Sequence, residues 1–390
     1  MLKFLTIASI FLTPIAANEL GKFVETNKDF AAAVYTKATK HKGENFLICP
    51  LSAEIVLTLA QNGAKGKTRS EIRKALYLPD STEEINSIFK KVVTDLKNHE
   101  GFTLRSANRI YVKEKYPIKE RFVKVATEIY DSSSENVDFG KPKEAAKVIN
   151  DWVAQETDDK IHELINEKSL REDTVAVLVN ALYLQASWRK HFKKTLTRSR
   201  DFYKSEENVV QVDTMMKSDY FGYFENKKLD AKYLQMQFKG GRNGSMVVVL
   251  PNEKEGLKKL EGKIGEVYRS DFLWEYVDVT LPKFRIETSI DFKKILKKLG
   301  VKRAFTRADF SEMAGKKGEV AITDVVQKTY IDVNENGVEA AAATAIMYHP
   351  KSLMDFFGEK KSFIADHPFL FYIIIDDIVV FTGRVVSPSG

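Results

Sequence analysis

The order of its predicted elements is the feature that most constrains how this 390-residue chain can fold. In the first half, apolar residues recur three and four positions apart, which predicts helices over residues 23–40, 52–63, 83–96 and 145–165. In the second half, short apolar runs predict strands over residues 174–184, 245–250, 276–284, 321–333, 369–375 and 378–385. Helices followed by antiparallel-type strands, with no repeat and no Gly/Ser/Pro linker, predict a single α+β domain over residues 18–390.

The N-terminus has the pattern of an export signal. Lys3 precedes a largely apolar run over residues 4–15, and the small residues Ala16 and Ala17 suit cleavage after Ala17. The run is too short to span a bilayer as a mature helix, so an uncleaved membrane anchor is the weaker alternative. We therefore expect residues 1–17 to be removed and the protein to be secreted. A disulfide within the chain is excluded, because Cys49 is the only cysteine, and its apolar neighbours favour a buried thiol.

The familiar signatures of enzymes and metal sites are missing from the sequence. There is no G-x-S-x-G or H-E-x-x-H motif, and the histidines show no ligand spacing. Residues 63–68 end like a phosphate-binding loop, but Gln61 stands where that motif needs a glycine, so we interpret them as a helix-ending turn. A triad assembled only in three dimensions stays open. The formal charge of +7 is explained by solubility alone, and we expect a monomer without metal, nucleic-acid or membrane partners.

Residues 333–351 have the least ordinary composition in the chain. Gly337 permits a backbone turn, and a run of four alanines follows Glu339. Because alanine favours helices, one interpretation is a short helix, and another is a flexible linker. The functional interpretation is a segment that is first exposed and then enters a sheet, where only small side chains fit. As a strand, it would turn Glu339 toward solvent and group on the opposite face Val338, Ala340, Ala342, Thr344 and Ile346.

This segment and further motifs along the chain resemble the serpin family. Residues 334–344, which read Asn-Glu-Asn-Gly-Val-Glu-Ala-Ala-Ala-Ala-Thr, are similar to the hinge of its inhibitory members. Each motif alone is weak, but their order and spacing match nearly the whole mature chain. The other matching positions are Asn45, Cys49, Pro50, Ser52, Asn150, Trp152, Val153, Thr157, Lys160, Ile161, Leu178, Val179, Asn180, Ala181, Trp188, Phe192, Leu281, Pro282, Lys283, Phe284, His367, Pro368, Phe369, Phe381, Gly383, Arg384, Val385 and Pro388.

The resemblance implies a serpin fold, with a helix-rich N-terminal part, a large central mixed β-sheet, further sheets and an exposed reactive-centre loop over about residues 335–366. It also implies protease inhibition and not catalysis: a protease cleaves the loop, forms a covalent acyl complex, and is trapped when the loop enters the sheet as a new strand. The family's hinge-to-bond spacing places the reactive bond at Lys351–Ser352, which suits a trypsin-like protease. Tyr348, Leu353 and Met354 are candidate secondary sites for chymotrypsin-like enzymes.

The resemblance assigns three groups of residues that control insertion. The hinge comprises Glu335, Gly337, Val338, Glu339, Ala340, Ala341, Ala342, Ala343 and Thr344. The breach, at the top of the sheet, comprises Trp188, Lys283 and Glu335, and we expect a salt bridge between the last two. The shutter, at its centre, comprises Cys49, Ser52, Asn180 and Gln327.

Three of these positions carry specific predictions. Val338 is apolar where a charge would block insertion, which predicts an inhibitory protein. Cys49 replaces the serine that is usual in the family, and Gln327 replaces a histidine that many members carry. The Gln327 amide can still donate to Asn180, but a pH response that depends on histidine there should be absent.

The overall pattern resembles secreted arthropod serpins, insect ones especially. This implies a haemolymph target, such as a trypsin-like protease of an immune or melanisation cascade. The mechanism requires no cofactor. Lys90, Lys91 and Lys97 match the family's heparin-binding helix, so a heparin-like sulfated glycosaminoglycan is a candidate rate enhancer. A solvated basic surface explains these lysines equally well. Asn243 begins the only N-glycosylation triplet.

Two other classes of function remain as alternatives. The first is a non-inhibitory serpin that acts as a carrier, storage protein or chaperone, for which a bulky or charged hinge would be the signature. A hydrolase is the more distant alternative.

Overall fold

The computed structural model describes residues 14–39, 43–97, 102–240, 244–268, 271–338 and 360–389. The α-helices in these ranges are α1 (Pro14–Ala38), α2 (Pro50–Asn62), α3 (Gly66–Ala75), α4 (Thr82–Lys97), α5 (Glu120–Tyr130), α6 (Pro142–Glu156), α7 (Leu257–Glu261), α8 (Ile264–Val267) and α9 (Phe292–Lys298). The strands are β1 (Phe46–Ile48), β2 (Phe102–Lys113), β3 (Ser133–Val137), β4 (Ala176–Ser187), β5 (Arg198–Ser205), β6 (Asn208–Asn226), β7 (Ala231–Gln237), β8 (Gly244–Pro251), β9 (Leu273–Pro282), β10 (Phe284–Asp291), β11 (Ile322–Asn334), β12 (Gly337–Val338), β13 (Lys361–Ile364), β14 (Phe369–Ile375) and β15 (Ile378–Val385).

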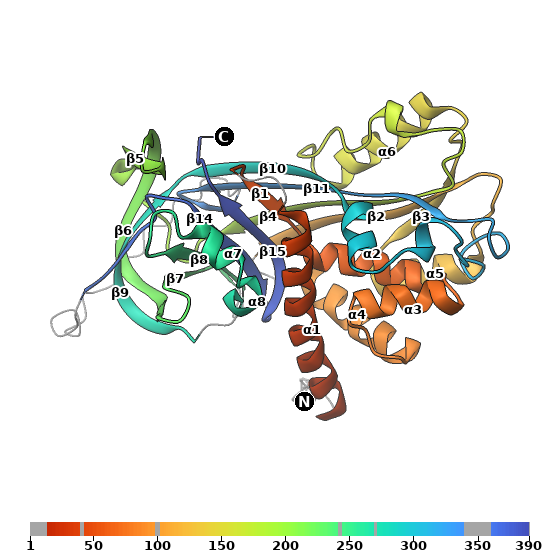
Figure 1. Cartoon of the computed structure of the whole chain (residues 1–390), viewed down its shortest axis with the longest axis horizontal. Coiled ribbons are helices and arrows are strands. Elements are labelled where there is room, and N and C mark those ends of the chain that lie inside the picture. The colour runs from red at the N-terminus through yellow and green to blue at the C-terminus, as the bar shows by residue number, and fades with distance from the viewer. Residues whose placement is uncertain are drawn as a thin grey trace, which may run out of the picture.

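A six-stranded mixed sheet runs through the middle of the molecule in the order β10-β11-β12-β4-β2-β3 (Figure 1). The pairs β11–β4 and β2–β3 are parallel, and the other neighbours are antiparallel. Side chains of β4 alternate between two apolar cores, as expected for a strand covered on both faces. Val177 and Val179 pack with α6 on one face, whereas Leu178 and Leu182 join the core that includes α2 on the other.

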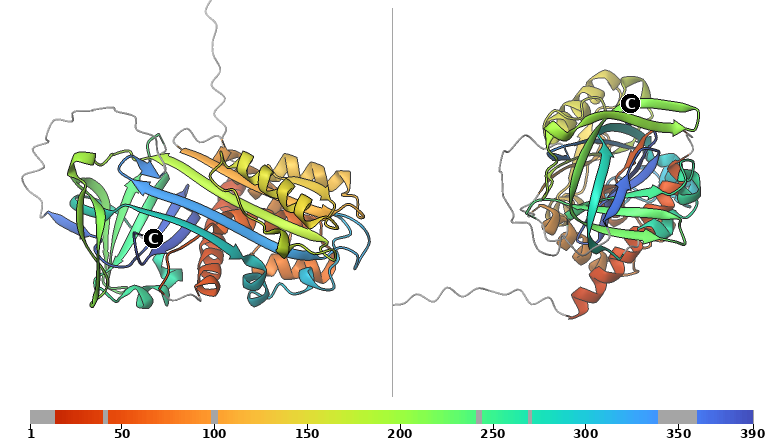
Figure 2. Two further views of the ribbon diagram at one scale, coloured as in Figure 1. Left: turned by 90° about the horizontal axis from the view of Figure 1, so that it is seen from above. Right: turned by 90° about the vertical axis from the view of Figure 1, so that its left-hand side faces the viewer.

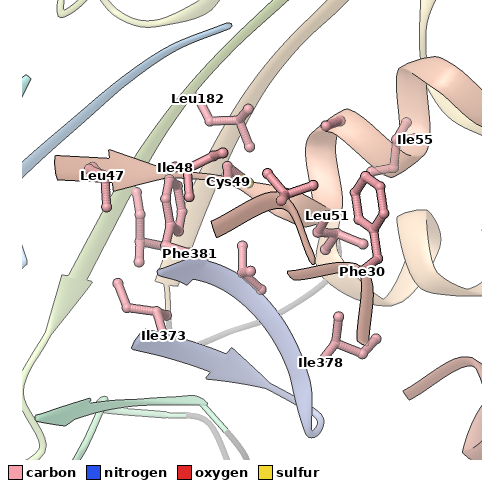
Figure 3. Close-up of a cluster of buried hydrophobic side chains, with 14 of the residues drawn as sticks. Phe30, Leu47, Ile48, Cys49, Leu51, Ile55, Leu182, Ile373, Ile378 and Phe381 are labelled. Atoms are coloured by element: carbon pink, nitrogen blue, oxygen red, sulfur yellow. The ribbon is translucent and has the colours of Figure 1, made fainter. Parts of the chain in front are cut away.

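The remaining strands form a second sheet in the order β1-β15-β14-β8-β7-β6-β9-β13, with β5 paired to β6. Figure 2 shows this sheet and the six-stranded sheet side by side along the molecule. Where α1, α2, β1 and β15 meet, buried side chains including Phe30, Ile48, Leu51 and Phe381 fill the space between them (Figure 3). One connected core thus holds the N-terminal helices against the C-terminal strands.

The α+β fold with a large mixed sheet is confirmed, but several predicted boundaries are wrong. The helix predicted to continue to residue 165 ends at Glu156. The strand predicted over residues 276–284 is two strands, because the chain leaves the nine-stranded sheet after Pro282 and enters the six-stranded sheet at Phe284. Residues 63–68 do follow the end of α2, and Gly66 already begins α3.

The predicted loop range of residues 335–366 is too wide at both ends, because it overlaps two strands. Residues 337–338 form β12, and residues 361–364 form β13. At the N-terminus, α1 begins at Pro14 and so includes residues 14–17 of the expected export signal. Among the described helices, none is long and apolar enough to cross a membrane.

Candidate functional site at the loop hinge

The two-residue strand β12 occupies the top of the six-stranded sheet between β11 and β4. Val338 pairs with Val333 of β11 on one side and with Ala186 of β4 on the other, and its side chain is buried. A Cβ at Gly337 would lie only 2.0 Å from the backbone oxygen of Ala186, so this close approach admits glycine alone. The start of the hinge therefore already lies in a strand position within the sheet.

Over the rest of their length, where β12 does not separate them, strands β4 and β11 pair with each other directly. Their parallel register runs from Ile322 opposite Ala176 to Tyr330 opposite Tyr183. We call this pairing the seam. A longer strand following Val338 could enter the sheet only if the hydrogen bonds of the seam were broken and remade on both sides of the new strand.

A row of buried amides holds the seam at its centre. Gln327 of β11 and Asn180 of β4 are register partners, and Gln327 Nε2 donates a hydrogen bond of 2.5 Å to Asn180 Oδ1. Asn180 is in turn the register partner of Asn108 on β2 and donates to its Oδ1 at 2.5 Å. Because these amides are almost fully buried, losing one partner would leave unsatisfied polar groups behind.

The N-terminus of α2 covers this row from one face of the sheet. The Cys49 backbone N–H donates to Gln327 Oε1 at 2.9 Å, and Gln327 Nε2 donates to the Cys49 carbonyl at 2.8 Å. Ser52 Oγ donates to Asn108 Oδ1 at 2.9 Å and accepts a hydrogen bond from Asn180 Nδ2. All four predicted shutter residues thus meet in one network. Cys49 contributes its backbone, and burial raises the pKa of its thiol far above the ordinary value.

The breach residues fix the turn that precedes β12. Trp188 is buried and stacks on Phe238 with ring centroids 5.4 Å apart. Its indole N–H donates to the Asn334 carbonyl at 2.9 Å, and its backbone N–H donates to the Asn336 carbonyl at 2.9 Å. Trp188 therefore binds both sides of the turn and sets where the hinge enters the sheet.

Glu335 lies inside this turn and makes the predicted ion pair. Its Oε2 lies 3.3 Å from Lys283 Nζ, and its Oε1 accepts a 2.8 Å hydrogen bond from the Thr197 hydroxyl. Burial by itself raises the pKa of Glu335, but the hydrogen bond from Thr197 and the charge of Lys283 more than offset this effect and lower it. Glu335 is therefore ionised at neutral pH and holds the turn to β9 and β10, which flank Lys283.

Several predicted site residues lie outside the described residues. They are the glycosylation candidate Asn243, the reactive-bond residues Lys351 and Ser352, the secondary sites Tyr348, Leu353 and Met354, and the hinge residues Glu339, Ala340, Ala341, Ala342, Ala343 and Thr344.

The three lysines proposed for polyanion binding all lie on α4. Lys91 pairs with Asp95 at 2.8 Å, and Lys97 pairs with Asp131 at 2.9 Å, whereas Lys90 is exposed. Carboxylates therefore already neutralise part of this basic helix.

Two residues of the site were missed by the sequence analysis. Asn108 closes the amide row, and Thr197 binds Glu335. The only local signal for Asn108 was a polar residue between the apolar residues Ala107 and Ile110 of β2. Thr197 follows a short 3-10 turn and has no such signal, because its partner is 138 residues away in the chain.

Comparison with known proteins gives one consistent family. A family model described as "Serpin (serine protease inhibitor)" matches residues 25–388. Antichymotrypsin-2 of Bombyx mori is 33% identical over 365 residues, which cover 92% of this chain and 96% of the relative. Antitrypsin of Bombyx mori is 32% identical over 395 residues, which cover 98% of this chain and 100% of the relative.

A solved structure agrees with this result. Serpin48, described as a highly specific serpin in the insect Tenebrio molitor, is 45% identical with a TM-score of 0.89, and the match covers 94% of this chain and 98% of that one. A buried hinge strand, a seam closed by amides and a family match over nearly the whole length together lead to one conclusion: the chain belongs to the serpin family of serine protease inhibitors.

Proposed function

We propose that this chain is a secreted suicide inhibitor of trypsin-like serine proteases. In this proposal the protease cleaves the loop at Lys351–Ser352 and remains bound through the acyl group on Lys351. The freed loop then extends β12 down the seam as a new strand and carries the protease with it. The setting that fits the insect relatives best is an extracellular cascade of the immune or melanisation type.

The observation that carries the proposal is the position of β12. Gly337 and Val338 already lie between β4 and β11, so the direction of further insertion is set by strand pairing in the folded protein. The alanines that follow in the sequence are small enough to pass between packed neighbours.

The energetics favour completed insertion. A new strand in the seam replaces one ladder of hydrogen bonds by two, which adds about a dozen bonds. At roughly 0.5–1.5 kcal/mol net for each bond, the gain is ~6–18 kcal/mol before packing is counted. A gain of this size is comparable to the whole stability of a protein domain, so it can distort a protease held at the end of the strand.

Incubation with trypsin tests the proposal. We expect a complex that survives SDS and heat, and a released C-terminal peptide whose first residue is Ser352. The Lys351→Glu variant should form no complex with trypsin, because an acidic residue is repelled by the carboxylate of the specificity pocket. Clean cleavage of the wild-type protein without a complex would instead support a non-inhibitory carrier, storage or chaperone role.

The proposal includes a sulfated glycosaminoglycan as a rate enhancer that binds α4. Inhibition rates with and without heparin, at several salt concentrations, test this part separately. Lys90→Ala should reduce any acceleration more than Lys91→Ala, because Lys91 is already paired with Asp95. An acceleration that all three lysine-to-alanine variants retain would exclude α4 as the binding site.

A further inference from the structure

The outer face of β6 and β9 carries an unusual row of aromatic and cationic side chains. Tyr220 and Tyr276 are register partners, and their rings meet edge to face with centroids 5.3 Å apart. Lys190 Nζ lies 5.8 Å from the centre of the Tyr220 ring, and Lys360 Nζ lies 6.0 Å from the centre of the Tyr276 ring. These four residues form what we call the aromatic row, with a cation over each end.

Trp274 extends the aromatic row toward solvent. It lies two positions before Tyr276 on β9, and therefore on the same face of the strand. Its register partner on β6 is Gly222, which has no side chain to cover the indole, and Trp274 is 53% exposed. Tryptophan and tyrosine are enriched where proteins contact partners, so this exposure indicates a docking surface.

The aromatic row spans the distance between the two ends of the loop. At one end, Lys190 follows closely after Trp188, whose backbone binds Asn336 in the hinge turn. At the other end, Lys360 is the first described residue after the loop and pairs with Asp278 at 2.6 Å. β6 and β9 lie at the end of the molecule opposite α3 and α5 (Figure 1). A protease that holds the loop between these two ends therefore comes to rest beside the row.

The charge around the row favours an acidic partner. Asp219 forms an ion pair with Lys190, and its Oδ2 lies 3.3 Å from Lys217 Nζ. Burial lowers the pKa of His191, the residue after Lys190; a backbone hydrogen bond with Asn336 raises it, and the charges of Lys217 and Lys239 lower it further. Lys190 and Lys217 share Asp219, and Lys360 pairs with Asp278, so three lysines face two carboxylates here. A partner with surface carboxylates therefore gains more from docking than a basic one.

We propose that the aromatic row and Trp274 form a second contact site for the protease that engages the loop. This inference rests on the proposed inhibitory function and deepens it. The site selects proteases whose surface beside the active site presents carboxylates and apolar side chains. The loop then sets which peptide bond is attacked, and the row sets which of the proteases that accept lysine are captured quickly.

Anionic and cationic trypsin test the inference, because they share the pocket for lysine and differ in surface charge. We expect faster association with the anionic form at low salt, and the Lys190→Ser/Lys360→Ser variant should lose this preference. Trp274→Ala should slow association with anionic trypsin by about tenfold without changing the number of inhibitors consumed per protease. Tyr77→Ala, at another exposed aromatic residue, and Lys147→Ser on α6 are matched controls that should keep the wild-type rates.

The outcomes separate the two proposals. If Trp274→Ala and the double lysine variant keep wild-type association rates while the covalent complex still forms, the second contact site is wrong and the inhibitory function stands. If the wild-type protein forms no covalent complex with either trypsin, both the proposed function and this inference are wrong.

Discussion

At the scale of single residues, Glu54 is a buried carboxyl group with a strongly raised pKa. It lies on α2, is fully buried, and accepts one hydrogen bond of 2.7 Å from Asn27 Nδ2. Within the described part of the chain, its other carboxyl oxygen has no hydrogen-bond partner. Burial raises the pKa of Glu54 from 4.5 to about 8, so the folded protein keeps this carboxyl protonated at neutral pH.

This raised pKa predicts a loss of stability with rising pH. The unfolded chain releases the proton near its ordinary pKa of 4.5, and the folded protein releases it only near 8. The free energy of unfolding should therefore fall through this window, by on the order of 4–5 kcal/mol. Glu54→Gln removes the titration, so its stability relative to wild type should rise from about pH 5 to about pH 9 in urea unfolding. Glu128→Gln, on an exposed position of α5, is the matched control for the loss of a carboxyl group. A constant difference between Glu54→Gln and wild type across this range would contradict the assignment.

Val338 carries a second prediction at the residue scale, because it is the hinge residue that already lies in the sheet. Its side chain is completely buried between β11 and β4, so Val338→Arg would place an unpaired charge in the sheet. We expect this variant to be cleaved by trypsin as a substrate, with little covalent complex on SDS gels. Val338→Thr is the matched control and should still inhibit, because a hydroxyl is much cheaper to bury than a guanidinium. An unchanged yield of complex in Val338→Arg would exclude insertion along the seam.

At the scale of elements, the seam between β4 and β11 is the part that must open. Its central link is neutral, because Gln327 donates to Asn180 without any titratable group. Gln327→His should therefore create a pH response that the wild type lacks. Burial would depress the folded pKa of the histidine below 6.5, so the variant should lose stability as the pH falls through about 6. Thermal unfolding over this pH range measures the effect. If the melting temperatures of variant and wild type change equally with pH, residue 327 is not buried in the seam as described.

The elements also show how far a sequence alone can predict this structure. Apolar patterning found α2 and β15, because each is a continuous buried run of mostly apolar residues. The same reasoning missed the long strand β6, whose first half pairs with β5 and mixes polar with apolar residues on both faces. It also joined β9 and β10 into one strand, because local pattern does not record that the chain changes sheets at Lys283.

In the candidate site too, some residues could be predicted from the sequence and others could not. Family motifs located Trp188, Asn180 and Gln327. The structure pairs the amides of Gln327 and Asn180, and it bonds Trp188 to Asn334 in the turn that contains Glu335. Asn108 and the aromatic row depend on strand register, which places residues far apart in the chain beside one another. Register follows from packing of the whole sheet, so no local signal could have predicted these contacts.

At the scale of the whole molecule, the proposed mechanism depends on strand pairs with β4 and β11 that the intact protein has not yet formed. In the six-stranded sheet β12 already lies between β4 and β11, and residues 339–359 follow it directly in the sequence. In the proposed mechanism this segment extends β12 along the seam. The intact fold is therefore expected to be less stable than the form in which this segment has entered the sheet. Cutting a chain normally lowers its stability, so the opposite result would be specific to insertion.

The most direct test of this account is the melting temperature before and after a single cut between Lys351 and Ser352. The account predicts that the cut protein, with both fragments still associated, melts more than about 10 °C above the intact protein, because the freed segment adds a full ladder of hydrogen bonds to the sheet. A cut protein that melts at the same or a lower temperature would contradict insertion into the seam.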